Sequence, residues 1–190
     1  MTEIFHQLSF GILIAAAIMA VVVGVERMIF ALANLRRAKM MLKQLNAANA
    51  ANLELLPLLG KDVVSTLIAE VMKSSQVTQD KAAKQDYVDA AYIHARDALF
   101  NRMWILDTIV TAAPLLGLLG TIFGIVETFL VLSKSGMSDP SGVSAGIGTA
   151  LYATALGIFV ALVGLVIFNY LTHKNERICE YLKMLILRVQ

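Results

Sequence analysis

Four polar side chains stand inside long apolar stretches of this chain, where they could carry an ion across a membrane. Thr121 and Glu127 lie in one stretch, and Thr149 and Thr154 lie in the next. Polar groups within a membrane are costly and tend to face protein or water, so several together favour a hydrated path. A lone membrane threonine more often bonds a carbonyl of its own helix. Both interpretations remain open for each threonine.

Two carboxylates lie at opposite ends of the first of these stretches. Glu127 is six residues beyond Thr121, about 9 Å further along a helix. We expect it either to pair with Lys134 at the outer boundary or to attract cations at the outer mouth of the path. Asp107 lies at the cytoplasmic mouth, where we expect a plain interfacial charge. The sequence contains no nucleophile–base pair, phosphate loop or metal-ligand spacing, so we expect neither an enzyme nor a bound metal or other cofactor.

Small residues recur in both stretches at steps of three and four. Lipid gives helices no hydrophobic reason to associate, so close packing of small residues does much of that work. The pattern predicts a tight hairpin within one subunit, and its presence on more than one face also favours a homo-oligomer. The residues expected to pack are Gly117, Gly120, Gly124, Gly146, Ala150 and Gly157.

The composition indicates an integral membrane protein. The chain has 190 residues, of which 58% are hydrophobic and only 16% are charged, whereas soluble domains carry more charge. Its net charge of +2 is too small to favour nucleic acid as a partner. The single cysteine, Cys179, excludes an internal disulfide framework.

Three membrane-spanning helices can be placed, which predicts an all-α membrane protein. Ten Lys and Arg residues lie between the first two spans, so the positive-inside rule places this segment and the C-terminus in the cytoplasm and the N-terminus outside. A helix from residue 79 is expected to run unbroken into the second span, and Asp139 and Pro140 are expected to start the third. The predicted division is 1–33 (outer N-terminus and first span), 34–105 (cytoplasmic helices), 106–132 (second span), 133–139 (outer loop), 140–172 (third span) and 173–190 (cytoplasmic tail). The second and third spans are expected to extend into a cytoplasmic helical bundle.

Two motifs in the apolar stretches are similar to those of a known family. The run Ala-Pro-Leu-Leu-Gly-Leu-Leu-Gly-Thr-Ile-Phe-Gly at 113–124 resembles the second-span signature of the ExbB/TolQ/MotA proton-channel family. The segment 146–157 resembles the third-span signature, and Asn169 matches the asparagine that closes it. The plan of three spans with a large cytoplasmic insertion is closer to ExbB and TolQ than to MotA, which has four spans.

The resemblance implies a subunit of an ion-driven motor, or stator, in the inner membrane of a Gram-negative bacterium. Members form a homopentamer around single-span helices of the ExbD/TolR type, and the complex uses proton-motive force to act on TonB or TolA in transport and envelope processes. A partner aspartate carries the proton, and Thr121 and Thr154 match the threonines that line its route.

One position departs from the family pattern. Thr149 stands where ExbB and TolQ commonly have a glutamate. We therefore expect the driving charge on the partner chain; the alternative is that Glu127 takes up part of that role from the outer side. Protons are favoured as the translocated ion; the alternative is sodium bound by the oxygens of Thr121, Thr149 and Thr154. An alternative from another class is an oligomeric membrane scaffold that conducts nothing.

Overall fold

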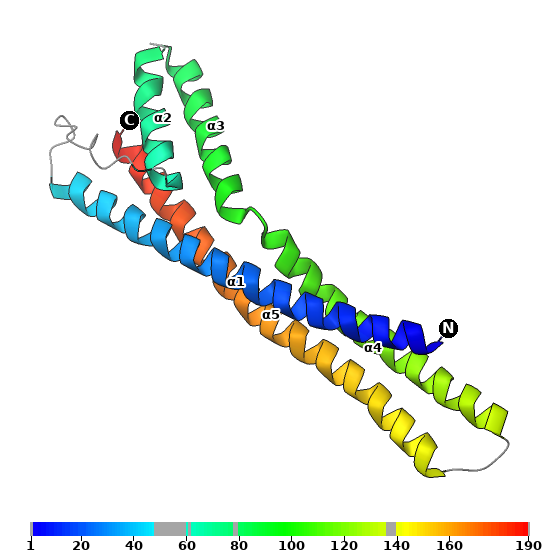
Figure 1. Cartoon of the computed structure of the whole chain (residues 1–190). Coiled ribbons are helices and arrows are strands. Elements are labelled where there is room, and N and C mark those ends of the chain that lie inside the picture. The colour runs from blue at the N-terminus through cyan, green and yellow to red at the C-terminus, as the bar shows by residue number, and fades with distance from the viewer. Residues whose placement is uncertain (1, 48–59, 61, 78–79, 136–139, 190) are drawn as a thin grey trace. The chain divides into compact units, whose positions relative to one another are not determined.

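The computed structural model describes residues 2–47, 60, 62–77, 80–135 and 140–189, and every helix or strand assigned in these ranges is an α-helix. The all-α class expected from the sequence is confirmed for this part of the chain. Asp139, which is expected to start the third span with Pro140, lies outside the described residues. In chain order the helices are α1 (Thr2–Ala47), α2 (Val63–Val77), α3 (Lys81–Phe100), α4 (Met103–Ser135) and α5 (Pro140–Val189), as Figure 1 shows.

The helices form two compact units, and α1 and α5 contribute to both. Unit 1 comprises Met1–Val25 and Arg102–Asn169, and unit 2 comprises Glu26–Asn101 and Tyr170–Gln190. Most charged residues belong to unit 2, since only six of the 16 basic and 14 acidic residues fall within unit 1. These six are Glu3, Arg102, Asp107, Glu127, Lys134 and Asp139.

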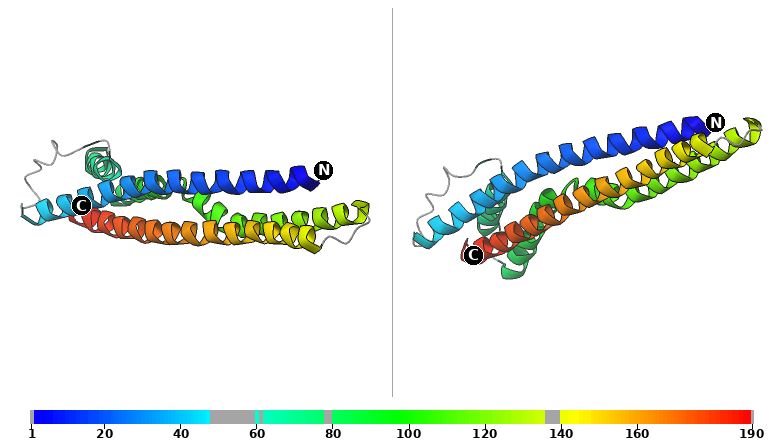
Figure 2. Two further views of the ribbon diagram at one scale, coloured as in Figure 1. Left: turned by 60° about the horizontal axis from the view of Figure 1, so that its bottom comes forward. Right: turned by 90° about the horizontal axis from the view of Figure 1, so that it is seen from below.

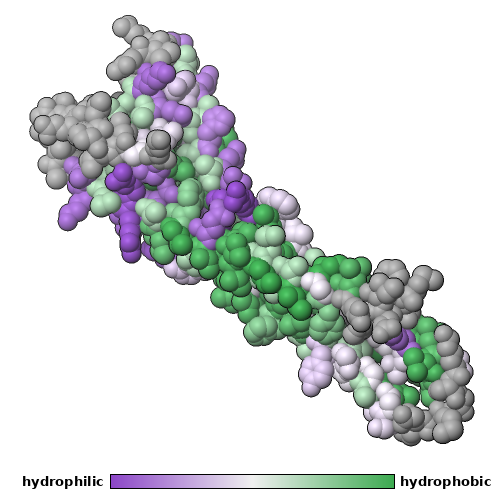
Figure 3. Space-filling view, in the orientation of Figure 1, coloured by the Kyte–Doolittle hydropathy of each residue, from purple (hydrophilic) through white to green (hydrophobic). Residues whose placement is uncertain are grey.

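Three helices are long and apolar enough to cross a membrane: Leu8–Gln44, Met103–Ser133 and Ser141–Arg188. The hydrocarbon core of a bilayer needs only about 20 helical residues, so each of these helices is longer than one crossing requires. Figure 3 shows hydrophobic side chains, in green, gathered over the helices of unit 1, whereas hydrophilic side chains, in purple, gather over unit 2. The apolar unit therefore provides the membrane-embedded part.

Unit 1 is built on the hairpin of α4 and α5, which lie side by side in all views (Figures 1 and 2). The N-terminal part of α1 packs against this hairpin. A Cβ added at Gly24 of α1 would lie 3.0 Å from the Ile167 side chain of α5, and a Cβ added at Gly120 of α4 would lie 3.9 Å from Cβ of Ser9. The contact at Gly24 is tighter than an ordinary side-chain contact, so glycine allows the close approach of α1 to α5 there, whereas the distance at Gly120 is an ordinary one.

Unit 2 has a helical core of its own, in which α2 and α3 form a second hairpin (Figure 1). Buried apolar residues follow each helix at steps of three and four, which is the pattern of one helix face turned to a core. On α2 they are Val64, Leu67, Ile68 and Val71, on α3 Val88, Ala91, Ala95 and Leu99, and on α5 Leu171, Ile178, Leu182 and Leu185.

Polar contacts join the helices of unit 2. Asp80 begins α3 by accepting a hydrogen bond from the Ala82 amide at 3.2 Å. Lys183 of α5 lies 5.4 Å from the centre of the Tyr92 ring of α3, within the range of a cation–π contact. Burial raises the pKa of the Tyr92 hydroxyl, and its hydrogen bond with Cys179 acts in the same direction.

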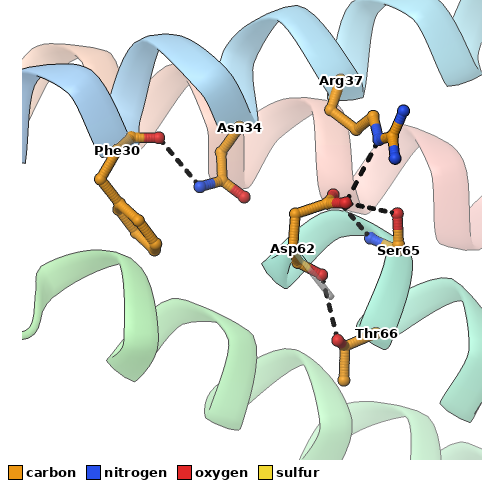
Figure 4. A network of polar contacts seen from close by, with 6 residues as sticks. All are labelled: Phe30, Asn34, Arg37, Asp62, Ser65 and Thr66. Carbon is orange, nitrogen blue, oxygen red and sulfur yellow. Dashed lines mark hydrogen bonds and ion pairs between the residues drawn. The ribbon is translucent and has the colours of Figure 1, made fainter. Parts of the chain in front are cut away.

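A polar cluster fixes the start of α2 against α1 (Figure 4). The Asp62 carboxylate accepts hydrogen bonds from the Ser65 amide at 3.2 Å and the Ser65 hydroxyl at 2.8 Å, which caps the first turn of α2. The same carboxylate accepts from Nε of Arg37 on α1 at 3.2 Å. A Cβ at Gly60 would lie 2.6 Å from both the Arg37 guanidinium and the Asp62 carboxylate, so glycine leaves room for this ion pair to close.

The unbroken helix expected from residue 79 into the second span is interrupted. Helix α3 ends at Phe100, and α4 begins at Met103 after Arg102, whose φ of 64° lies in the left-handed region. The buried Asn175 side chain of α5 donates to the Leu99 carbonyl at 3.0 Å, and so satisfies a carbonyl at the end of α3 that the helix itself leaves open. Of the second and third predicted spans, only the third lies on a helix that continues unbroken into unit 2, because α5 runs on to Val189.

Candidate ion pathway between α4 and α5

Glycines let the backbones of α4 and α5 meet at the middle of the hairpin. A Cβ added at Gly157 would lie 2.5 Å from the Ala113 carbonyl oxygen and 3.0 Å from Cα of Gly117. A Cβ added at Gly117 would lie 2.8 Å from the Ala153 carbonyl oxygen. Because the opposing atoms belong to the backbone, no side chain could move aside to make room. The two helices therefore depend on glycine at both positions.

The seam continues toward the end of α4 at Ser135 and the start of α5 at Pro140. Ala150 and Ala153 are 0% exposed, and a Cβ added at Gly120 would lie 2.8 Å from Cβ of Ala153. Beyond them a Cβ at Gly146 would collide with Thr128, whose hydroxyl donates to the carbonyl of Gly124 at 2.8 Å. Five of the six residues predicted to pack, Gly117, Gly120, Gly146, Ala150 and Gly157, thus lie along the contact of α4 with α5 within one chain, and the sixth, Gly124, is buried on α4.

Thr121 and Thr154 meet across this seam. Their hydroxyl oxygens are hydrogen-bonded to each other. Both hydroxyls also lie within hydrogen-bond distance of the Gly117 carbonyl, Thr121 at 3.2 Å and Thr154 at 3.0 Å, and Thr121 reaches the Ala150 carbonyl at 3.2 Å. Both side chains are half-buried. The hairpin therefore gathers four oxygen atoms from two helices at one point.

The two hydroxyls have fewer hydrogens to donate than there are acceptors around them, so their hydrogen bonds can be rearranged. Each threonine hydroxyl has one hydrogen to donate and two lone pairs that accept. Two hydrogens are shared among the Gly117 carbonyl, the Ala150 carbonyl and the two hydroxyls themselves. A water or hydronium ion arriving on the exposed side can donate to a remaining lone pair, and each hydroxyl can turn to another acceptor. The cluster is suited to hand on a proton or to supply oxygens to a small cation.

Thr149 is not brought to this cluster. Its exposed side chain donates to the carbonyl of Ala145 in its own helix at 3.0 Å, which is the behaviour of a lone membrane threonine. Glu127 is half-exposed on α4, on a different face from Thr121. The side chain of Lys134 lies outside the described residues, so the predicted Glu127–Lys134 pair stays a prediction.

Several buried polar residues escaped the sequence analysis because they lie outside both motifs. Asn175 and Asn34 are each 2% exposed and Arg27 is 7% exposed. Asn34 donates to the carbonyl of Phe30 at 2.9 Å (Figure 4), and Arg27 lies 5.1 Å from the centre of the Phe30 ring. The sequence signal that could have identified them is a polar residue three or four positions from apolar residues of a buried helix face. Asn169, which the resemblance singled out instead, is exposed.

Comparison with known proteins adds an independent line of evidence. The chain is 38% identical over 84 residues to the biopolymer transport protein ExbB of Aquifex aeolicus, covering 44% of this chain and 57% of that protein. It is 37% identical over 91 residues to the putative biopolymer transport protein ExbB-like 2 of Helicobacter pylori, covering 48% of this chain and 59% of that protein. It is also 37% identical over 76 residues to the Tol-Pal system protein TolQ of Haemophilus influenzae, covering 40% and 33% of the two chains. The chain thus spans less than two thirds of the length of these relatives.

The match to a family as a whole is more extensive than any of these pairwise similarities. It covers residues 60–184, which include both threonines and the whole contact of α4 with α5. Together with the three helices able to cross a membrane, this match establishes that the chain belongs to the MotA/TolQ/ExbB proton channel family.

Proposed function

We propose that this chain is an ExbB/TolQ-like subunit of an ion-driven motor and that the Thr121–Thr154 cluster lies on the route of the ion. The observation that carries the proposal is the meeting of the two hydroxyls with two backbone carbonyls inside an apolar hairpin. Threonine hydroxyls also join packed membrane helices, but both hydroxyls of this pair are half-buried and not fully enclosed, and polar groups in a membrane tend to face protein or water.

The motor needs a partner that carries charge. Within the described part of α5, no carboxylate lies between Pro140 and Asn175, so this segment supplies hydroxyl and carbonyl oxygens but no acidic side chain. We propose that a single-span protein of the ExbD/TolR type contributes an aspartate, that several copies of this chain surround it, five by analogy with the family, and that the motion acts on a protein of the TonB or TolA type. Relatives named ExbB and TolQ support this assignment.

The proposed location is the inner membrane of a bacterium. Charged residues are concentrated in unit 2, and the positive-inside rule then orients this unit toward the cytoplasm and the N-terminus toward the periplasm. Protease accessibility of tags at the two ends in right-side-out vesicles tests the orientation. Cleavage of a C-terminal tag from outside would contradict it.

The decisive experiment measures proton flux into liposomes that contain the complex of this chain with its partner. We expect flux in the wild-type complex, loss of flux when the partner's membrane carboxylate is replaced, and at least tenfold lower flux for Thr154→Val. This magnitude corresponds to one hydrogen bond of about 1.4 kcal/mol on the route. Thr108→Val is the matched control, because Thr108 is exposed and bonds only the carbonyl of Trp104 in its own helix, at 2.8 Å.

The same assay separates the alternatives. A complex that assembles with its partner but conducts no ion is the non-conducting scaffold. Flux that persists without a proton gradient and follows a sodium gradient identifies the sodium-driven version. We favour protons, because each hydroxyl can accept a hydrogen from one neighbour while it turns to donate its own hydrogen to the next.

A further inference from the structure

We infer that Asp107 and Thr111, together with the backbone carbonyl of Val110, form the cytoplasmic half of the ion route. This inference rests on the proposed function and extends it from the Thr121–Thr154 cluster to the inner end of α4. It assigns a role to Asp107 that goes beyond the interfacial charge expected from the sequence.

The first support is a single face of α4. Asp107, Pro114 and Thr121 follow one another at intervals of seven residues, and residues seven apart on a helix lie within about 20° of one face. Thr111 and Leu118, four residues after Asp107 and Pro114, fall on the same stripe. The Thr121 cluster and the Asp107 carboxylate are therefore the two ends of one line along the helix, about 21 Å apart at 1.5 Å per residue.

The second support is exposure. Asp107 and Thr111 are both exposed in unit 1, and Leu118 between them and Thr121 is 51% exposed. At Asp107, Thr111 and Leu118 the stripe is therefore open, and it meets α5 at Thr121, where the hydroxyl bonds Thr154 and the Ala150 carbonyl. A carboxylate and a hydroxyl on the open face of a membrane helix are costly against lipid, so they are expected to face water or protein. A lumen formed by several copies around a partner would supply that environment.

The third support is the chemistry between the two ends. Pro114 lies inside α4 and has no N–H, so the carbonyl of Val110, four residues earlier, loses its helical donor and can accept from water. The Thr111 hydroxyl donates to the carbonyls of Asp107 at 3.1 Å and Thr108 at 3.0 Å, which leaves its lone pairs free to accept. The next polar groups toward Thr121 are the two hydroxyls of the Thr121–Thr154 cluster, both of which are half-buried. Acceptors thus follow one another from Thr111 to the Thr121 cluster.

The carboxylate completes the route. Among the side chains that the structure describes in unit 1, Asp107 and Glu127 are the acidic ones and Arg102 is the basic one. Glu127 lies on α4 beyond Thr121, on the far side of the cluster from Asp107, so Asp107 is the acidic group on the inner side. A proton that reaches it through water binds a carboxylate oxygen, forming the neutral acid. The acid then releases the same proton to cytoplasmic water and regenerates the carboxylate.

The test uses the complex with its partner in liposomes, with proton flux and thermal stability measured on the same samples. We expect Asp107→Asn to lower flux about tenfold at low ionic strength, because an anionic mouth raises the local concentration of cations at least by that factor. We expect Asp107→Glu to restore flux. Thr111→Val is expected to lower flux about tenfold, as one lost hydrogen bond would. Since both side chains are exposed, folding and assembly should be unchanged.

Two matched controls and a salt series separate this role from a structural one. Thr108→Val removes an exposed hydroxyl from the neighbouring face of α4, and Asp97→Asn removes an exposed carboxylate from α3; both should leave flux intact. The part of the Asp107→Asn deficit that comes from weaker attraction of cations should shrink near 1 M salt, where the Debye length is only about 3 Å, whereas the part that comes from lost proton binding should remain. Wild-type flux with Asp107→Asn, or an equal loss in the controls, would overturn the inference. If the Asp107 variants conduct normally but Thr154→Val blocks flux in the same preparation, the inference fails and the proposed function stands. If the wild-type complex conducts no ion, the proposed function itself fails.

Discussion

Replacing Gly157 by alanine should separate α4 from α5 and disrupt the threonine cluster nearby. The added Cβ would lie 2.5 Å from the Ala113 carbonyl oxygen, 3.0 Å from Cα of Gly117 and 3.2 Å from its amide nitrogen. Ordinary contacts between carbon and oxygen are about 3.5 Å, so the helices must move apart by about 1 Å at this point. Thr154 is one turn away, and its 3.0 Å bond to the Gly117 carbonyl would lengthen to about 4 Å, beyond hydrogen-bonding distance.

The energetic effect follows from three terms. Overpacking costs about 1–3 kcal/mol, and loss of the hydrogen bond costs about 1 kcal/mol more. The higher helix propensity of alanine offsets about 1 kcal/mol. The net destabilisation is therefore about 1–3 kcal/mol, which lowers the melting temperature by roughly 3–9 °C for a chain of this length.

Circular dichroism during thermal unfolding of the purified protein in detergent measures this change. Gly148→Ala is the matched control, because Gly148 lies in the same helix and an added Cβ there meets nothing within 4 Å. It should leave the melting temperature unchanged or raise it slightly. Gly164→Ala should be intermediate, since its neighbour at 3.1 Å is a methyl group of the Val110 side chain and not a backbone atom. Equal melting temperatures for Gly157→Ala and Gly148→Ala would refute the close contact of the two backbones.

Two further predictions concern unit 2. Asp62→Ala should destabilise the attachment of α2 by about 1–2 kcal/mol, because it removes a helix cap together with the bonds to Arg37 and Ser65. Amide hydrogen exchange measures the effect, with Asp80→Ala at the start of α3 as the control. Exchange in α2 after Asp62→Ala should accelerate more than exchange in α3 after Asp80→Ala, and equal effects would contradict the role of Arg37. Asn175→Leu should lower the free energy of unfolding by about 1–3 kcal/mol, since the buried side chain donates to the Leu99 carbonyl at 3.0 Å. Asn169→Leu, at an exposed position, should have little effect, and chemical denaturation measures both. An unchanged free energy of unfolding in Asn175→Leu would show that this bond between α5 and α3 does not stabilise the protein.

Much of the membrane part could be predicted from the sequence because its signals are local. Small residues at helical spacing identify a close-packed face, and the positions of Gly117 and Gly157 follow from that pattern alone. Which threonine faces which is another matter, since it depends on the register of α4 against α5. The pairing of Thr121 with Thr154, and the separation of Thr149 from both, required the structure.

The features that escaped prediction depend on contacts between distant residues. No glycine or proline marks the end of α3 at Phe100, and the bond that accompanies it comes from Asn175, 76 residues beyond Leu99. The role of Gly60 likewise depends on Arg37 reaching Asp62 from another helix. Sequence periodicity locates helices and their buried faces, but it carries no information about such partners.

The central claim is that Thr121 and Thr154 act as one element on the ion route, and a double-mutant cycle on proton flux tests it most directly. Flux would be measured in liposomes for the wild-type complex, Thr121→Val, Thr154→Val and the double variant. The two hydroxyls bond each other and both bond the Gly117 carbonyl. Each single variant should therefore lower flux at least tenfold, and the double variant should lower it little further. Full flux in either single variant, or losses that multiply in the double variant, would contradict the account.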